Sequence, residues 1–213
     1  MRGGLVFALA LSLAVSGEAC VTQHARVDFS DQDRGLRGAD YGGVFTRWTR
    51  HDRLAQGADT VLEVWGTMRS WEFREAYVER YSDLYGVNDA DRQAMKKNQH
   101  EVQEESLEFV VVAQCWNYKW NDFNKPSSPW RITVIDGAGH ELMPESIHLE
   151  RLPDLFEREF YPTRTPFSKT YVVRFKRPKD KGAFLGEDSG RITLRFASPQ
   201  GQAELVWIGE GEG

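Results

Sequence analysis

The sequence predicts a mainly β protein, an immunoglobulin-like or related two-sheet antiparallel β-sandwich with an inserted α-helical hairpin. Several short segments alternate apolar and polar residues, which is the pattern of strands that are buried on one face only. Another segment, SLEFVVVAQCW, is continuously apolar and indicates a central strand that is buried on both faces. Between these segments the apolar spacing changes to that of a helix, which predicts helices within a chain of strands.

Residues 1–19 have the features of a signal peptide. Arg2 supplies a positive charge, and residues 5–15 form an apolar run that is too short to span a bilayer. Small residues follow at Gly17 and Ala19, where signal peptidases require them. We therefore expect this segment to be removed from the mature protein.

Cys20 follows the signal peptide directly. A cysteine at this position becomes the lipidated first residue of bacterial lipoproteins, so we expect an N-terminal lipid anchor with the membrane as its partner. The expected location is the cell envelope, facing the periplasm or the cell exterior. Because Gly17 and Glu18 depart from the usual lipoprotein cleavage pattern, soluble secretion and an uncleaved or cytosolic form stay open as alternatives.

The rest of the chain divides into a tether, one domain and a tail. Residues 20–41 are polar and contain glycine, so we interpret them as a flexible tether, and residues 209–213 as a disordered tail. Residues 42–208 suit a single domain. Within it, residues 42–54 and 60–68 alternate and contain tryptophan and β-branched residues, so they predict two strands joined by the turn AQGAD.

The helical insertion is expected at about 69–106. In SWEFREAYVERYSDLYG, aromatic residues recur at helical spacing from Phe73 to Tyr81, and Gly86 stands where a helix stops. Asn88 suits the N-cap of a second helix. The apolar stripe of this second helix is thin, so we expect it to be mostly solvated.

More strands follow the helical hairpin. Each alternates or is continuously apolar, and the last two are joined by ASPQGQ, which suits a hairpin turn. The segment WRITVID is closed by the turn residues DGAG. In order, these strands are SLEFVVVAQCW, WRITVID, TYVVRF, RITLRF and AELVWI.

Several of these segments together resemble those of uncharacterised predicted bacterial lipoproteins. They are TRWTR, LEVWGTMRSWEFREAYVERYSDLYG, the strand that ends in DGAG, YPTRTPFSKTYVVRF and the terminal strand with LVW. The resemblance covers residues 42–208, and it rests on residues that serve packing. It implies a lipoprotein location and a β-sandwich, and it brings no catalytic residues.

Composition and motifs argue against several classes of function. The net charge is −5 and the basic residues are scattered, which argues against a nucleic-acid partner. Neither a nucleophile elbow, a phosphate-binding glycine loop nor HExxH occurs, so we assign no catalytic residues and no cofactor. His140, Glu141, Glu145 and His148 are close in sequence, but Pro144 prevents a helix, so we expect a solvated loop and no metal site.

The stretch CWNYKWNDFNKPSSPW is the best lead to a ligand. If the preceding strand continues through it, Trp116, Tyr118 and Trp120 point to one face. Such rings stack on sugars or contact proteins, and Asp122 and Trp130 would complete the contact surface. In the alternative interpretation the rings cap the core, and the asparagine and proline turns lead into the next strand.

These observations favour a non-catalytic binding or scaffolding domain of the cell envelope. Its partner would be an envelope protein or a glycan. The more specific alternative is a carbohydrate- or peptidoglycan-binding module that uses the loop from Trp116 to Trp130. An envelope hydrolase is a lesser alternative, because sequence spacing cannot select a catalytic pair among so many acids.

Overall fold

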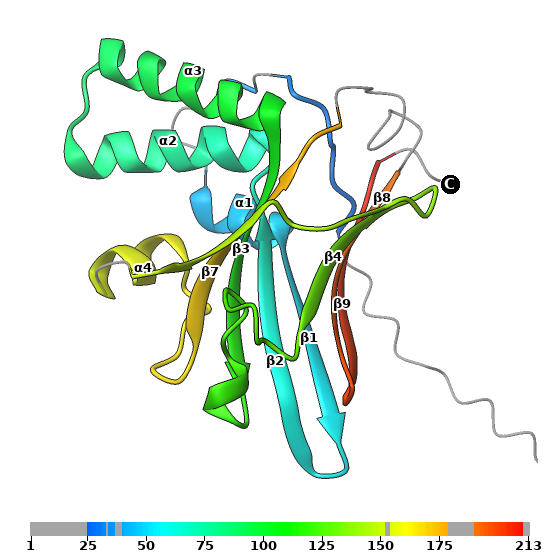
Figure 1. Ribbon diagram of the computed structural model, residues 1–213. Coiled ribbons are helices and arrows are strands. Elements are labelled where there is room, and N and C mark those ends of the chain that lie inside the picture. The colour runs from blue at the N-terminus through cyan, green and yellow to red at the C-terminus, as the bar shows by residue number, and fades with distance from the viewer. Residues whose placement is uncertain (1–24, 33, 37–39, 152–153, 179–189, 211–213) are drawn as a thin grey trace, which may run out of the picture.

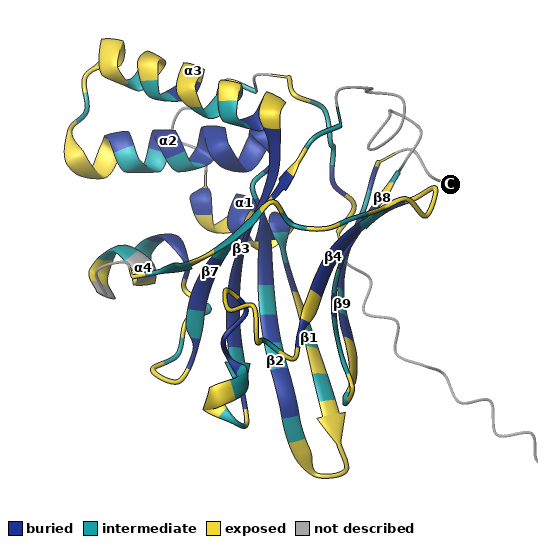
Figure 2. Cartoon of the chain, in the orientation of Figure 1, coloured by how far each residue is buried: buried dark blue, intermediate teal, exposed yellow. Residues whose placement is uncertain are grey.

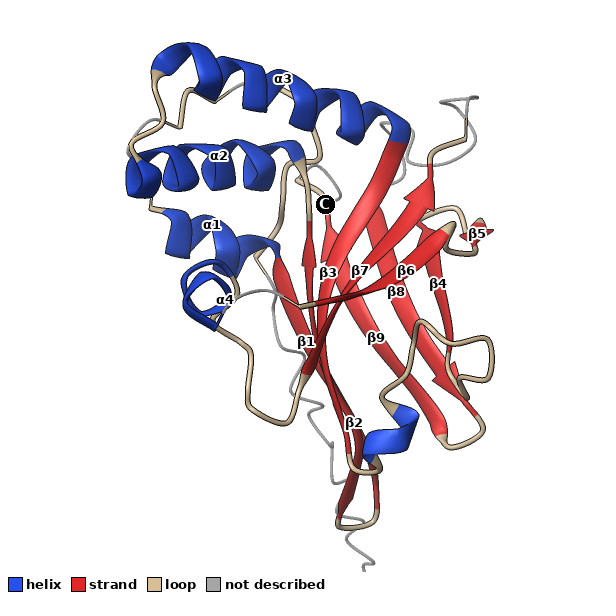
Figure 3. Cartoon of the chain, turned by 60° about the vertical axis from the view of Figure 1, so that its left-hand side comes forward, coloured by secondary structure: helices blue, strands red, loops and turns tan. Residues whose placement is uncertain are grey.

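The protein forms two antiparallel sheets that face each other, with helices beside the larger sheet (Figures 1 and 3). The computed structural model describes residues 25–32, 34–36, 40–151, 154–178 and 190–210. The predicted signal peptide and Cys20 lie outside these residues. The mainly β sandwich with an inserted helical hairpin is confirmed.

The larger sheet has the strand order β1-β2-β3-β7-β6, and the smaller has the order β5-β4-β8-β9. The helical hairpin α2–α3 lies between β2 and β3, which pair with each other, so it is an insertion between neighbouring strands. The helices are α1 (Tyr41–Trp48), α2 (Trp71–Tyr85), α3 (Asp89–Glu105) and α4 (Asp154–Phe160), with the 3₁₀ turn η1 (Tyr118–Trp120). The strands are β1 (Thr49–Gln56), β2 (Asp59–Met68), β3 (Ser106–Cys115), β4 (Arg131–Asp136), β5 (Glu141–Leu142), β6 (Ser146–Glu150), β7 (Lys169–Lys176), β8 (Arg191–Ser198) and β9 (Gly201–Ile208).

The hairpin helices begin and end where the sequence predicts. The Ser70 side chain accepts a hydrogen bond from the backbone of Phe73 and starts α2, and Gly86 ends α2 in the left-handed conformation with φ 65°. The Asn88 side chain accepts a hydrogen bond from the backbone of Asp91 and starts α3. Figure 2 shows that the outer side of α3 is exposed, as its thin apolar stripe predicts. Among the described helices, none is long and apolar enough to cross a membrane.

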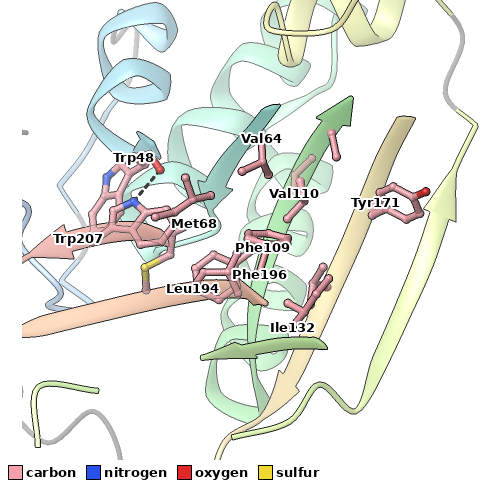
Figure 4. Close-up of a cluster of buried hydrophobic side chains, with 14 of the residues drawn as sticks. Trp48, Val64, Met68, Phe109, Val110, Ile132, Tyr171, Leu194, Phe196 and Trp207 are labelled. Atoms are coloured by element: carbon pink, nitrogen blue, oxygen red, sulfur yellow. Dashed lines mark hydrogen bonds between the residues drawn. The ribbon is translucent and has the colours of Figure 1, made fainter. Parts of the chain in front are cut away.

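The core lies between the two sheets (Figure 4). Phe109 of β3 packs against Phe175 of β7, with ring centroids 5.9 Å apart, and against Trp207 of β9, at 5.2 Å. The Trp207 indole donates a hydrogen bond of 2.9 Å to the backbone carbonyl of Trp48, which ties α1 to the core. The sheets approach so closely at Gly66 that a Cβ atom there would lie 2.4 Å from the Leu205 side chain.

Side chains of β1 close the gap between the edges of the two sheets. Arg50 donates through Nε to the carbonyl of Val206 on β9 (2.8 Å), and its guanidinium lies 5.8 Å from the centroid of the Trp207 ring. The Asp52 carboxylate accepts a hydrogen bond from the backbone of Glu204 (2.7 Å). These contacts satisfy backbone groups that an open edge strand would leave without partners.

The first predicted strand is corrected by the structure, because residues 41–48 form the helix α1 and β1 begins only at Thr49. Tyr41, Val44, Phe45 and Trp48 are buried, and their spacing is that of one helix face. The bulky apolar residues of this short segment are compatible with the alternation of a strand as well as with the spacing of a helix. The contacts of Trp48 with the core select the helix.

The predicted tether and tail are also corrected in part. Val27 is fully buried, and its backbone donates to Ile208 (2.9 Å) and accepts from Glu210 (2.8 Å). Val27 and Gly209 form a parallel bridge beyond the end of β9. Some residues on each side of the domain therefore belong to its packed structure.

A buried carboxylate joins the helical hairpin to the larger sheet. Glu108 of β3 is ion-paired with Arg74 of α2 (2.6 Å) and with Arg69 (3.4 Å), and it accepts a hydrogen bond from Arg174 of β7 (2.8 Å). Burial raises the pKa of Glu108, but the guanidinium groups of Arg74 and Arg69 lower it more, so that it falls to about 2. The carboxylate therefore remains ionised at neutral pH.

The contact between α2 and α3 is ionic as well. Lys96 of α3 is buried between Glu75 (3.1 Å) and Glu79 (2.8 Å) of α2. Burial lowers the pKa of Lys96, but its hydrogen bonds to Glu79 and Glu75 raise it more. Arg92 also contacts Glu79, at 3.3 Å. The inner face of α2 is thus charged, where the sequence pattern indicated only an aromatic stripe.

We expect Glu108→Gln to lower the free energy of unfolding by about 3 kcal/mol at pH 7, because folding lowers the pKa of Glu108 from its ordinary value of 4.5 to about 2. This contribution is present above pH 4.5 and is lost as the pH falls towards 2. Urea denaturation of the wild type and the variant between pH 7 and pH 2.5 measures it.

The matched control is Glu101→Gln, at an exposed position of α3. Its free energy of unfolding should stay within about 0.5 kcal/mol of the wild type. A difference between wild type and Glu108→Gln that is the same at pH 7 and at pH 2.5 would contradict the assignment.

Candidate functional site

The aromatic stretch lies at the end of β3 that is remote from the helical hairpin (Figure 1). Trp116 and Tyr118 are 74% and 73% exposed. Trp120 is half-buried and packs against the core. Asp122 and Trp130 are buried, so their side chains offer no outer contact surface. The five candidate residues therefore do not form one surface.

The expectation of three rings on one strand face is wrong because β3 ends at Cys115. The backbone of Trp116 donates to Val61 on β2 (3.3 Å), and the chain then turns into η1. The Asn117 side chain caps this turn by accepting a hydrogen bond from the backbone of Lys119 (3.1 Å). The alternation of a strand stops there, and Trp116 and Tyr118 project into solvent.

Asn121 fixes the loop to the sheet. Its side-chain amide donates to the carbonyl of Ala113 (2.7 Å), and its backbone carbonyl accepts from the Lys169 ammonium. The Tyr171 hydroxyl lies 2.8 Å from this carbonyl and 3.0 Å from Oδ1 of Asn121. Burial raises the pKa of Tyr171, so its hydroxyl stays protonated and can donate. The exposed rings are therefore held on an ordered support.

The second half of the stretch is part of the core. Phe123 is buried, and the centroid of its ring lies 4.9 Å from Tyr171, 5.6 Å from Phe196 and 6.1 Å from Trp130. The two interpretations of the stretch thus apply to different residues. Phe123 and Trp130 cap the core, whereas Trp116 and Tyr118 are available for contact.

Phe167 is a further exposed ring at this end of the sheet, and sequence reasoning did not select it. It is 79% exposed in the loop before β7. The neighbouring Thr165 hydroxyl donates to the Gln114 side chain (3.1 Å), and β7 starts opposite Ala113 of β3. The segment FYPTRTPFSKTY was visible in the sequence as rich in proline and rings. Its pattern did not separate exposed rings from packed ones.

The described part of the chain places Cys115 and His140 in ordinary structural contacts. Burial raises the pKa of Cys115 to about 12, so its thiol is a poor nucleophile. Within the described ranges, no group of three or more His, Cys, Asp or Glu residues is arranged to hold a metal ion. His140 contacts Asp136, with 2.9 Å between Nδ1 and Oδ2, in the turn after β4.

Comparisons of this chain with protein-family models, with curated proteins and with solved structures found no match.

We expect Asn121→Ala to loosen the loop and to lower the free energy of unfolding by about 1–3 kcal/mol, because the buried carbonyl of Ala113 loses its side-chain donor and the Tyr171 hydroxyl keeps only the backbone carbonyl of residue 121 as acceptor. Amide hydrogen exchange of residues 116–121 should become faster. The matched control is Asn124→Ala at an exposed position, which should leave both quantities unchanged. Unchanged exchange in Asn121→Ala would contradict the supporting role of this side chain.

Proposed function

We propose that this chain is a non-catalytic binding protein of the bacterial cell envelope and that Trp116 and Tyr118 stack on its glycan ligand. The observation that supports this proposal is the exposure of the two rings on a loop fixed by the hydrogen bonds of Asn121. A loop whose backbone is already ordered loses little conformational entropy on binding, so the contact area of its rings converts efficiently into affinity.

The surroundings of the rings favour a glycan as the ligand. The faces of Trp and Tyr suit the flat C–H faces of sugar rings, and the indole N–H and the phenol add polar contacts. Lys119, Asn124 and Lys125 are exposed in the same loop and can hydrogen-bond to sugar hydroxyl groups. Phe167 is a further exposed ring, in a loop that the hydrogen bond between Thr165 and Gln114 ties to the same end of β3.

The proposed location follows from the N-terminal sequence. The positive charge, the short apolar run and Cys20 support export and lipid attachment. Val27 is held by the domain, so a lipid on Cys20 would keep the domain close to the membrane. Cell-wall glycan would then lie within reach of the domain.

We expect the wild-type protein to co-sediment with purified peptidoglycan and Trp116→Ala and Tyr118→Ala each to weaken this binding by about tenfold, because each removes one stacking surface. A pelleting assay over a range of peptidoglycan concentrations gives the affinities. Circular dichroism should show that both variants keep the fold, since both side chains are exposed.

Tyr85→Ala is the matched control, because Tyr85 is an exposed ring at the far end of α2. It should bind peptidoglycan as the wild type does. Wild-type affinity in both loop variants would refute the assigned surface. A wild type that does not sediment with peptidoglycan, but is captured by an envelope protein through Trp116, would replace the glycan with a protein partner.

Lipid attachment is tested by metabolic labelling of cells with a palmitate analogue. We expect the wild-type protein to be labelled and Cys20→Ser to be unlabelled, because the thiol is the attachment atom. Cys115→Ser is the control and should keep the label, since Cys115 is buried in β3. Equal labelling of wild type and Cys20→Ser would reject the anchor.

A further inference from the structure

A cavity of about 260 Å³ lies on the outer face of the larger sheet, separate from the aromatic loop. Its floor is formed by Val110 of β3 and Val172 of β7, which are paired in register. Tyr77 of α2, Phe156 of α4 and Tyr161 form the remaining apolar walls. The middle of the site is apolar and walled by rings, as pockets for single-ring compounds are, and polar residues line the rest, among them His148 of β6, which is paired with Val172.

One end of the cavity is rich in guanidinium groups. Arg69 and Arg174 line it together with Glu108, and Arg74 contacts the same carboxylate from α2. Three cations thus share one anion at this end. The hydrogen bonds of Arg69 are long, 3.4 Å to Glu108 and 3.3 Å to the Tyr161 hydroxyl, so its N–H groups retain capacity to donate to a second anion.

The other end of the cavity contains a buried hydroxyl group. Thr170 lines the cavity and is only 2% exposed, and its Oγ1 has no hydrogen-bond partner among the residues that the structure describes. Glu150 of β6 is paired with Thr170 and also lines this end. Buried polar atoms normally have partners, so Thr170 Oγ1 retains the capacity for a hydrogen bond with a ligand group that comes within reach.

The two ends are separated by the length of a small molecule. Thr170 and Arg174 are four residues apart on β7, which corresponds to about 13 Å along a strand. Val172 lies between them on the same face of the sheet. The cavity therefore offers guanidinium donors, then an apolar floor, then the acceptors Thr170 and Glu150.

We propose that this cavity binds a small aromatic carboxylate whose carboxylate is held by Arg69 and Arg174, whose ring packs on Val110 and Val172, and whose para hydroxyl group reaches Thr170. The paired N–H groups of a guanidinium match the two oxygens of a carboxylate in geometry. The aromatic side chains that wall the cavity favour a ligand with an aromatic ring. A hydroxyl group at the far end donates to the Glu150 carboxylate or to Thr170. This site is independent of the proposed glycan contact.

The proposal is tested by calorimetric titration of the full chain with 4-hydroxyphenylacetate, phenylacetate and 4-hydroxyphenylacetamide. We expect 4-hydroxyphenylacetate to bind about tenfold more tightly than phenylacetate, which lacks the hydroxyl group, and than the amide, which lacks the charge. Absence of binding at millimolar 4-hydroxyphenylacetate, or equal affinity for the acid and the amide, would overturn the proposal.

Two variants locate the binding. Val172→Phe fills the cavity and should abolish binding. Thr170→Val keeps the side-chain shape and should remove the advantage of 4-hydroxyphenylacetate over phenylacetate while the melting temperature stays equal or rises, because an unpaired buried hydroxyl is lost. If Thr170→Val keeps that advantage, or a folded Val172→Phe binds as the wild type does, the assigned cavity is wrong.

The double variant Trp116→Ala/Tyr118→Ala is the control for the independence of the two sites. It should bind 4-hydroxyphenylacetate with wild-type affinity, since neither ring lines the cavity. Loss of binding in this double variant would place the carboxylate at the aromatic loop and overturn the proposal. Peptidoglycan sedimentation of Val172→Phe should equal that of the wild type, so the failure of one proposal leaves the other testable.

Discussion

The pairing of Glu108 with three guanidinium groups is the constraint on which the joint between the helices and the sheet depends. Arg74 comes from α2, Arg69 from the connection between β2 and α2, and Arg174 from β7. A carboxylate as buried as Glu108 is costly unless cations surround it, so these elements must meet at hydrogen-bonding distance. The same geometry leaves Arg69 and Arg174 at the wall of the cavity. Two of the guanidinium groups that stabilise the buried Glu108 are thus also the ones that we propose to bind the carboxylate of the ligand.

Strand β3 connects the two regions to which we assign binding. It starts at the end of α3 and finishes at the aromatic loop, ten residues later, which is about 33 Å along a strand. Its inward side chains, such as Phe109, build the core between the sheets, and its outward side chains, such as Glu108 and Val110, face the helices and the cavity. Because both faces are covered, the strand provides a rigid frame, and the loop and the cavity share this frame without sharing a side chain.

The sequence predicted the elements whose pattern is local. Alternation located β7, where Tyr171 is buried and Arg174 is exposed, and the helical spacing from Phe73 to Tyr81 together with Gly86 located α2. Local sequence patterns could not predict features that depend on tertiary contacts. The burial of Arg74 depends on Glu108, which is 34 positions away, and a charged residue by itself predicts exposure. Trp116 and Trp130 are the same residue type in the same stretch, and the end of β3 at Cys115 decides which of them is exposed.

The bridge between Val27 and Gly209 has a consequence for how far the domain stands from a surface. Only six residues lie between Cys20 and Val27, so the two are at most about 25 Å apart when the chain is fully extended. Val27 is held near Arg50 and Ile208, at the end of the sandwich where α1 meets the core, whereas Trp116 follows β3 at the opposite end. If Cys20 is anchored as we propose, the near end of the sandwich stays within this distance of the bilayer, and the exposed rings lie at the end of the sandwich that is remote from the anchor.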